Sequence, residues 1–395
     1  MRPNKGDFEV VIVNRLKEKG AVSLFVVAFA TLLITVITIS FVRIMIQDQQ
    51  QASAADLSQS AYDSAQAGVE DAKRALLRYQ SLCNSGDVAG CAMAKENISS
   101  SVCNSAVGTL NDINEFSSEV KIKTAEGDDS LDQAYTCVKI NLQTNDYLGS
   151  LGQDESKMVP LVGSSDFDTI RIEWFSIKDL QTADMAVDVP SYNLGTPLLS
   201  QNNWTSGVNQ NRPSIMRAQL IQLDDKSGFS LSDFNSNDDS MGSSRTLFLY
   251  PSSIPDNMKY FVDDRRNEPN EPTQVNCKSS LTGGGYACSA TIKLPNIITD
   301  DEYKAYLNLT SLYKATSYRI LLLDSDSKVV SFNAVQPEID STGRTSNLFR
   351  RVKSRVELTD VNFPYPEVEI NIKDNFCKNF RITNNPADYV SNCNP

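Results

Sequence analysis

The chain has 395 residues, of which 41% are hydrophobic and 22% charged, so it can build one large or two ordinary domains and is not intrinsically disordered. Its formal net charge of −12 disfavours nucleic acid as a partner, because an acidic surface repels phosphates. The sequence contains no histidine, which excludes Ser/His/Asp and Cys/His nucleophile systems, ordinary histidine zinc sites and histidine proton shuttles.

The amino-terminal region joins a charged leader to a long apolar segment. Residues 1–20 hold five basic residues against three acidic ones, and the 22 residues from Ala21 to Val42 contain no charge. As a helix that segment spans about 33 Å at 1.5 Å per residue, enough for the roughly 30 Å hydrocarbon core of a bilayer. We therefore predict a single membrane crossing with a basic, cytoplasmic amino end.

A cleaved secretory signal peptide is the alternative explanation of this segment, with Ala52-Ser53-Ala54 as its small-residue cleavage site. Signal peptides have apolar regions of about 7 to 15 residues, which is shorter than the segment observed here. The polar residues 47–53 would also place the cleavage site far from the membrane. A retained membrane anchor is therefore the favoured interpretation.

A helical pattern continues beyond the apolar segment to about Tyr79. No proline occurs between Pro3 and Pro160, and small or apolar residues recur at steps of three and four, as on one face of a helix. That face is formed by Leu57, Ala61, Ala65, Gly68, Ala72, Leu76 and Tyr79. We expect its small residues to allow close packing against a sheet or a second helix.

Two stretches carry a resemblance to a known family: KEKGAVSLFVVAF, from Lys17 to Phe29, and AYDSAQAGVEDAKRALLRY, from Ala61 to Tyr79. Together they resemble the amino-terminal region of type IV prepilins, and of the PilX-like minor pilins in particular. The resemblance implies that a prepilin peptidase removes the leader, residues 1–20, by cleavage between Gly20 and Ala21, and that Ala21 is then N-methylated. It also implies, as partners, other pilins bound through the helix of residues 21–80 and the inner-membrane pilus assembly machinery.

The fifth residue of the mature chain departs from the pattern of the major pilins. Major pilins carry a glutamate there, which is thought to neutralise the amino terminus of the adjacent subunit, whereas this chain has Phe25. The K-type pseudopilin of type II secretion, which is placed at the filament tip, and many PilX-like minor pilins lack that glutamate too. The resemblance therefore implies a minor subunit at or near the tip of a filament.

Residues 81–395 form the predicted extracellular head. Alternating apolar and polar residues predict strands over residues 137–144, 169–174, 217–223 and 368–372. Residues 318–335 indicate a hairpin with its turn at 324–327, and one further helix is predicted over residues 300–314. The predicted fold class is α+β, with a long amino-terminal helix that carries a strand-rich head.

Polar stretches rich in Asn, Ser, Asp and Pro predict three loops in the head, over residues 201–213, 232–244 and 263–274. The second of these loops is the predicted boundary between two lobes, near residues 235–244.

The head also contains all eight cysteines, an even number without a Cys-x-x-Cys pair. This spacing favours a disulfide framework outside the cytoplasm over metal ligation. Pairing of nearest neighbours is one of 105 connectivities and gives Cys83–Cys91, Cys103–Cys137, Cys277–Cys288 and Cys377–Cys393.

Three short patterns have the residue types of a reactive or metal site but lack the companions that such a site needs. Ser311 and Lys314 form a Ser-x-x-Lys pattern without Ser-Asp-Asn or Lys-Thr-Gly elsewhere. The turn at 324–327 resembles a metal-ion-dependent adhesion site but is followed by Lys328, which would repel a cation. The acidic loop 233–242 offers oxygen ligands for calcium without the glycine and closing glutamate of an EF-hand. We predict no catalytic residue and no metal site, and calcium at loop 233–242 is the one candidate cofactor.

From these features we expect a non-enzymatic minor pilin that serves pilus assembly and attachment to a surface or a host cell. Support of twitching motility or DNA uptake is implied by the resemblance alone. The chain would be a single-pass membrane protein before assembly and would lie in an extracellular pilus or on the cell surface afterwards. Two alternatives are a permanently anchored surface binding protein that does not polymerise, and an extracellular hydrolase with a carboxylate pair, which 49 Asp and Glu residues allow but no spacing identifies.

Overall fold

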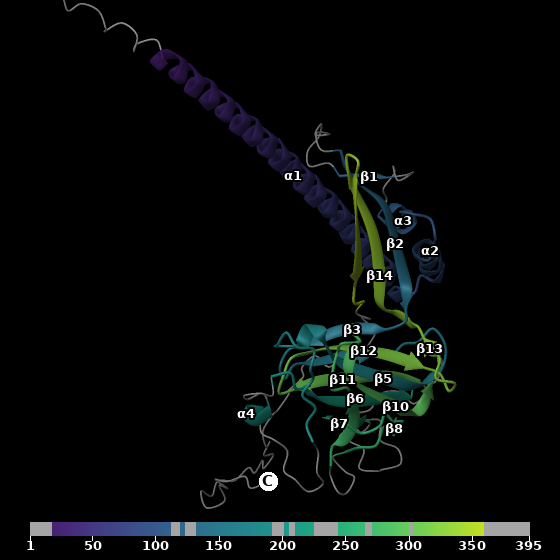
Figure 1. Cartoon of the computed structure of the whole chain (residues 1–395). Coiled ribbons are helices and arrows are strands. Elements are labelled where there is room, and N and C mark those ends of the chain that lie inside the picture. The colour runs from purple at the N-terminus through teal and green to yellow at the C-terminus, as the bar shows by residue number, and fades with distance from the viewer. Residues whose placement is uncertain are drawn as a thin grey trace, which may run out of the picture. The chain divides into compact units, whose positions relative to one another are not determined.

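The computed structural model describes residues 18–111, 119–122, 132–191, 201–204, 210–224, 244–264, 271–299 and 303–358. They form one long helix, shorter helices and two β-sheets (Figure 1), which confirms the predicted α+β class. The described residues fall into two compact units. The first holds those within 1–68, 118–137 and 341–352, and the second holds those within 69–117, 138–340 and 353–395.

Helix α1 spans Glu18–Asn84, a length of 67 residues. Neither proline nor glycine interrupts it between Gly20 and Gly68, which explains why it continues past the apolar segment as predicted. It ends just before Gly86, whose positive φ of 79° is a backbone conformation that terminates helices. The predicted packing face is confirmed, since Ala61, Ala65, Gly68, Ala72 and Leu76 are all buried.

The smaller sheet has four strands in the order β1-β2-β14-β15. Their bounds are Val120–Lys121, Gln133–Thr144, Phe332–Thr345 and Leu348–Arg355. Strand β1, the start of β2, the end of β14 and the start of β15 belong to the first unit together with α1 up to Gly68.

In the first unit, strand β14 touches the backbone of α1 directly at Gly343. A Cβ atom added at Gly343 would lie 2.2 Å from the backbone nitrogen of Ala65 and 2.3 Å from the carbonyl oxygen of Ala61. Such distances are far below any van der Waals contact, so only glycine fits at this position. Ser341 and Thr345 are buried on the same face of β14, because side chains two residues apart share one face of a strand.

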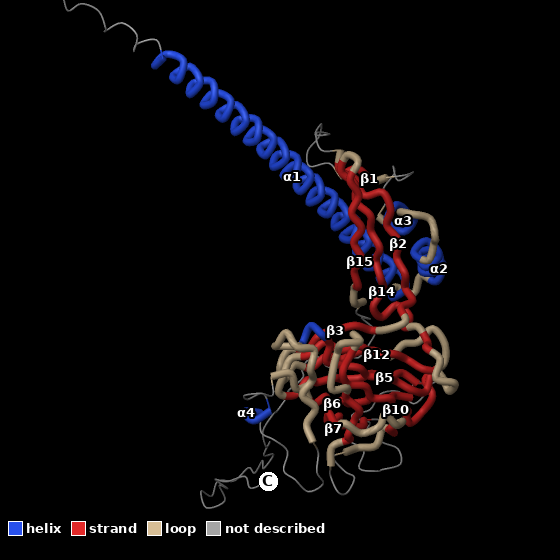
Figure 2. Tube along the Cα trace, viewed as in Figure 1, coloured by secondary structure: helices blue, strands red, loops and turns tan. Residues whose placement is uncertain are grey.

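The larger sheet has eleven strands and lies in the second unit (Figure 2). Nine strands follow the order β13-β12-β5-β10-β9-β7-β6-β11-β4, while β3 pairs with β12 and β8 with β10. In chain order the bounds are β3 Tyr147–Leu151, β4 Ser156–Pro160, β5 Phe167–Ser176, β6 Ile215–Asp224, β7 Ser244–Ser252, β8 Lys259–Tyr260, β9 Thr273–Cys277, β10 Tyr286–Ile298, β11 Tyr303–Leu312, β12 Thr316–Leu323 and β13 Val329–Val330.

The core of the second unit is one cluster of buried side chains contributed mainly by this sheet. Its largest members include Trp174, Phe167, Phe175, Phe261 and Phe332, each at most 2% exposed. The predicted strands over 137–144, 169–174 and 217–223 are confirmed within β2, β5 and β6. The hairpin is confirmed as well, since β12 and β13 pair antiparallel across the predicted turn. The predicted strand over 368–372 lies outside the described residues.

The helix predicted over residues 300–314 is wrong, because strand β11 occupies Tyr303–Leu312. Strand β11 pairs with β6 on one side and with β4 on the other. Residues 305–311 are all buried, so exposed and buried positions do not alternate along the strand. Its tyrosines and leucines, Tyr303, Tyr306 and Leu307 among them, recur at the steps of three and four residues that are typical of a helix.

Two short helices were not predicted. Helix α2 spans Val88–Ile98 and helix α3 spans Ser105–Leu110. Their small residues give little contrast between two faces, so their sequences lack the periodic pattern that identifies a helix. The remaining helical elements are the single turns η1, Ile177–Asp179, and α4, Gln201–Trp204.

Residues 235–243, at the predicted lobe boundary, lie outside the described residues. The strands on either side of them, β6 and β7, pair antiparallel in one sheet. The two units therefore do not correspond to the two predicted lobes, since they divide the chain at other positions.

Two stacked tyrosines connect strands β3 and β12 in the second unit. The rings of Tyr147 and Tyr318 have centroids 6.2 Å apart, and the Tyr147 hydroxyl donates a hydrogen bond of 2.8 Å to Glu357. Tyr318 lies in register with Gly149, where a Cβ atom would come within 2.5 Å of the ring. Burial raises the pKa of both tyrosines above the ordinary value.

The contact at Gly343 predicts that Gly343→Ala destabilises the chain. We expect a loss of about 1–3 kcal/mol or more, because a methyl group in this position forces the strand and the helix apart. Thermal unfolding of the full chain in detergent measures this loss of stability. The matched control is Gly283→Ala, since a Cβ atom at Gly283 meets nothing within 4 Å. Equal midpoints for the two variants would contradict the close approach.

The buried hydroxyls beside this contact predict a gain in stability. The side-chain oxygens of Ser341 and Thr345 are buried and have no hydrogen-bond partner among the described residues. We expect Thr345→Val to stabilise the chain by about 1 kcal/mol, because an unsatisfied buried hydroxyl is replaced by a methyl group of similar shape. Thr342→Val, on the opposite face of β14, is the control and should leave the unfolding midpoint unchanged.

The stacked tyrosines predict that stability falls at alkaline pH. Unfolded tyrosines lose their protons near pH 10, whereas raised pKa values keep Tyr147 and Tyr318 protonated in the folded chain. The folded state then binds more protons than the unfolded state, so stability decreases as the pH rises through 10. Unfolding midpoints between pH 8 and 11 should fall less steeply in the double variant Tyr147→Phe/Tyr318→Phe. Tyr260→Phe, at an exposed position, should keep the slope of the unmodified chain.

Candidate functional site

The amino half of α1 exposes a continuous apolar surface, here called the stem surface. It is formed by the large apolar side chains between residues 24 and 46, which include Leu24, Phe25, Phe29, Leu33, Phe41 and Ile46. Among the described residues, α1 is the one helix long and apolar enough to cross a membrane. Exposure of so much apolar area to water is unfavourable, so the stem surface requires lipid or other apolar surfaces around it.

The hydroxyl groups between residues 24 and 46 are satisfied by the helix itself. Thr31 and Thr35 donate hydrogen bonds of 2.9 and 2.8 Å to carbonyl groups three residues earlier. Thr38 and Ser40 donate to carbonyl groups four residues earlier, at 2.8 and 2.9 Å. These hydroxyls need no water, which suits a helix in hydrocarbon.

The residues predicted for leader cleavage all lie in α1. Gly20 and Ala21 are part of its helical backbone, within the first turns after Glu18. Phe25 is 69% exposed on the stem surface. No charged residue lies between Ala21 and Val42, and Arg43 is the first one beyond that stretch. Phe25 is therefore an apolar position that is accessible to neighbouring molecules.

Beyond the stem surface, the first unit fixes α1 to the sheet by polar contacts as well as by Gly343. The Nε of Arg350 donates a hydrogen bond of 2.8 Å to the Ser58 hydroxyl. Within the sheet, Arg344 forms ion pairs with Glu119 at 3.0 Å and with Asp132 at 2.7 Å. The hydrogen bond from Arg344 lowers the pKa of Asp132. These contacts tie β15 to the helix, and β14 to the residues just before β1 and β2.

Two of the predicted disulfide pairs, Cys83–Cys91 and Cys277–Cys288, are confirmed. The first joins the end of α1 to α2, and the second joins residues that face each other in strands β9 and β10. Cys103 and Cys137 are both disulfide-bonded. Cys377 and Cys393 lie outside the described residues.

The short patterns from the sequence do not form reactive sites where they are described. Ser311 directs its hydroxyl to the carbonyl oxygen of Lys314 at 2.6 Å, not to the ammonium group. Asp324 accepts hydrogen bonds from the backbone nitrogens of Asp326 and Lys328, which closes the hairpin turn. The described residues contain no group of three or more Cys, Asp and Glu side chains placed to hold a metal ion. The candidate calcium loop 233–242 lies outside them.

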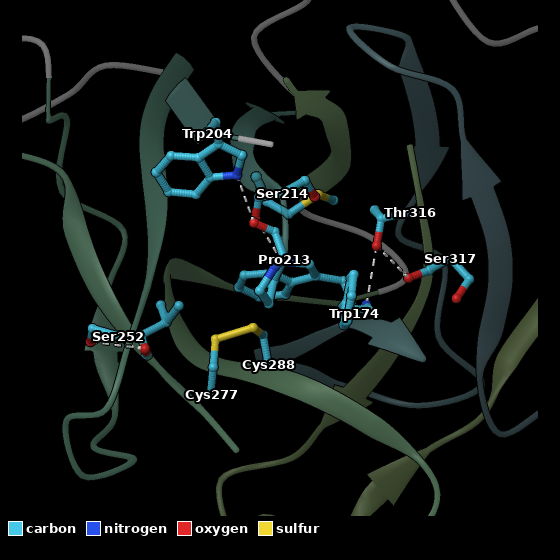
Figure 3. Close-up of a disulfide and its surroundings, with 12 residues drawn as sticks. Trp174, Trp204, Pro213, Ser214, Ser252, Cys277, Cys288, Thr316 and Ser317 are labelled. Carbon is cyan, nitrogen blue, oxygen red and sulfur yellow. Dashed lines mark hydrogen bonds between the residues drawn. A yellow bond between two sulfur atoms is a disulfide. The ribbon is translucent and has the colours of Figure 1, made fainter. Parts of the chain in front are cut away.

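Sequence reasoning missed a polar and aromatic cluster in the second unit. Figure 3 shows the indoles of Trp174 and Trp204, whose nitrogens donate to the carbonyl oxygens of Ser214 and Pro213, both at 3.0 Å. The buried guanidinium of Arg212 lies 5.2 Å from the Trp204 ring and 3.4 Å from Asp188. The two indole hydrogen bonds hold Pro213 and Ser214, which lie in the surroundings of the Cys277–Cys288 disulfide (Figure 3). No local motif in the sequence indicates this cluster.

The ammonium group of Lys314 reinforces the same region. It donates a hydrogen bond of 2.5 Å to the carbonyl oxygen of Gln210 and lies 4.9 Å from the centroid of the Phe175 ring. Burial lowers the pKa of Lys314. Because its donors are turned toward a backbone carbonyl and an aromatic face, Lys314 acts in packing.

No protein family model, curated protein or solved structure matches the chain. Its function is therefore inferred from the residues described above.

Proposed function

We propose that this chain is a minor pilin of a type IV pilus, incorporated through α1 and placed at or near the filament tip. The observation that carries the proposal is the continuity of α1, because one helix of 67 residues contains both the stem surface and the packing face at Ala61 and Ala65. The resemblance of the sequence around Gly20 to prepilins supports the same conclusion.

Continuity of the helix favours a filament subunit over a simple anchor. An anchor needs only an apolar segment, and a flexible linker after it serves equally well. Here Gly343 contacts the helix backbone less than twenty residues after the last large apolar side chain of the stem surface, at Ile46. A stem held in this way transmits a fixed orientation to the sheet, which packing into a regular filament requires.

The apolar character of position 25 supports a terminal position in the filament. A buried charge in hydrocarbon is unfavourable unless it is paired. Phe25 offers no carboxylate to neutralise the amino terminus of a neighbouring subunit, so insertion in the middle of a filament lacks that pairing. In this proposal the chain primes pilus assembly and presents its head for attachment, and its partners are other pilins, the prepilin peptidase and the assembly machinery of the inner membrane.

The proposal predicts a processed amino terminus. In protein purified from its native cell, intact mass and amino-terminal sequencing should show loss of residues 1–20 and a methylated Ala21. A variant with Gly20→Leu should keep its leader, because the bulky side chain blocks the cleavage that the resemblance implies at Gly20. The control Gly283→Leu, where a Cβ atom meets nothing within 4 Å, should be processed normally.

A native chain that begins at Met1 would contradict the proposal. It would favour the permanently anchored binding protein, which keeps α1 in the membrane and does not polymerise.

A further inference from the structure

A polar groove in the second unit is separate from the stem surface. It has a volume of about 490 Å³ and is lined by residues from the end of α2, from β2 and from β14. In β2 the side chains of Lys139, Asn141 and Gln143 are exposed, while those of Ile140 and Leu142 between them are buried. The volume lies within the range of about 300–1,000 Å³ that is typical of sites for small ligands.

The groove is preformed, because covalent and hydrogen bonds fix the elements that line it. The Cys83–Cys91 disulfide joins α2 to the end of α1. Asn104, just before α3, donates from its backbone nitrogen to the carbonyl oxygen of Val138 at 3.0 Å, and its side chain accepts from the Val138 nitrogen at 2.8 Å. The segment that carries α2 is thus fastened to β2, so a ligand meets a rigid surface and little ordering opposes its binding.

Several side chains in the groove have unused hydrogen-bonding capacity. The ammonium groups of Lys95 and Lys139 form no ion pair and no hydrogen bond within the described part of the chain. The same holds for the side-chain amides of Gln143 and Asn333. From β14, Glu338 and Asp340 add carboxylates that already have partners within the protein, since Glu338 is paired with Lys353 at 2.8 Å and Asp340 is engaged as well.

These groups define the chemistry of a matching ligand. The two ammonium groups are donors only and require an anionic acceptor, whereas the amides both donate and accept. The carboxylates of Glu338 and Asp340 accept hydrogen bonds from neutral donors such as hydroxyl groups. A ligand with carboxylates separated by stretches of hydroxyl groups offers both kinds of partner.

Other ligand classes fit this groove less well. No exposed aromatic side chain lines it, so it lacks the stacking platforms that bind single-stranded nucleic acid. The apolar residues Ile140 and Leu142 are buried and provide no pocket for the apolar anchor of a helical or hydrophobic peptide.

We propose that the groove binds an acidic polysaccharide, with Lys95 and Lys139 holding the carboxylates of its uronic acid rings and Gln143 and Asn333 holding their hydroxyl groups. The proposal goes beyond the pilin assignment and does not depend on it, because a monomeric chain presents the same groove.

The test measures binding of oligogalacturonate to the full chain in detergent micelles by titration calorimetry at physiological salt. We expect the double variant Lys95→Gln/Lys139→Gln to raise Kd by about tenfold or more, since it removes two charge-assisted contacts. The matched control, Lys178→Gln/Lys278→Gln, changes the net charge equally at two exposed lysines outside the groove and should bind like the unmodified chain. Gln143→Ala should weaken binding without changing its dependence on salt.

Two further ligands identify the chemistry that is recognised. Carboxyl-reduced oligogalacturonate, which keeps the hydroxyl groups but lacks the charge, should bind at least about tenfold more weakly. Polyglutamate, which has carboxylates without sugar hydroxyls, should also bind more weakly. Absence of oligogalacturonate binding, equal losses in the two double lysine variants, or binding of polyglutamate as tight as that of oligogalacturonate would each overturn the proposal. All of these outcomes are independent of whether the leader is cleaved.

Discussion

The contact between Gly343 and the backbone of α1 is the constraint on which the first unit depends. The helix offers Ala61 and Ala65 to this contact and β14 offers Gly343, with Ser341 and Thr345 buried on the same face of the strand. Such small side chains bury little apolar area, so the hydrophobic effect contributes less here than in the core around Trp174. The stability of the contact comes instead from close approach, because dispersion attraction depends on many atoms at short distance. A contact of this kind tolerates no enlargement on either side.

The same helix is adapted to two environments along its length. Between residues 24 and 46 it exposes large apolar side chains, and its hydroxyls bond to its own backbone. From Ala61 onward it buries small residues against protein, with Arg350 bound to Ser58 near the transition. The change occurs without a break in the backbone. Because one uninterrupted helix joins them, the apolar part of α1 and the sheet of the first unit keep a fixed orientation relative to each other. This is the physical basis for the proposed role in a filament.

Much of the fold could be predicted wherever a local pattern determines the structure. The uncharged run from Ala21 to Val42 and the small-residue steps after it identified α1, and both confirmed disulfides join cysteines close in sequence. Prediction failed where contacts between residues distant in the sequence determine the structure. Strand β11 pairs with β6 and β4 and is buried on both faces, while its tyrosines and leucines recur at steps typical of a helix. Gly343 was not identified, because a glycine within a strand does not reveal which backbone will approach it.

The candidate sites show the same limit, because local sequence motifs do not identify residues that only folding brings together. Motif patterns directed attention to Ser311 and Asp324, yet both bond to nearby backbone and have little capacity left for a ligand. The groove is built from residues that resemble no motif, and Lys95, Lys139 and Asn333 are brought together only by the packing of α2, β2 and β14. The lysine and amide side chains of this groove are not engaged by the described protein, so a ligand competes only with water for them. In a chain without histidine, where histidine-dependent catalytic arrangements are excluded, unused donors in a rigid groove are a better guide to binding than sequence motifs are.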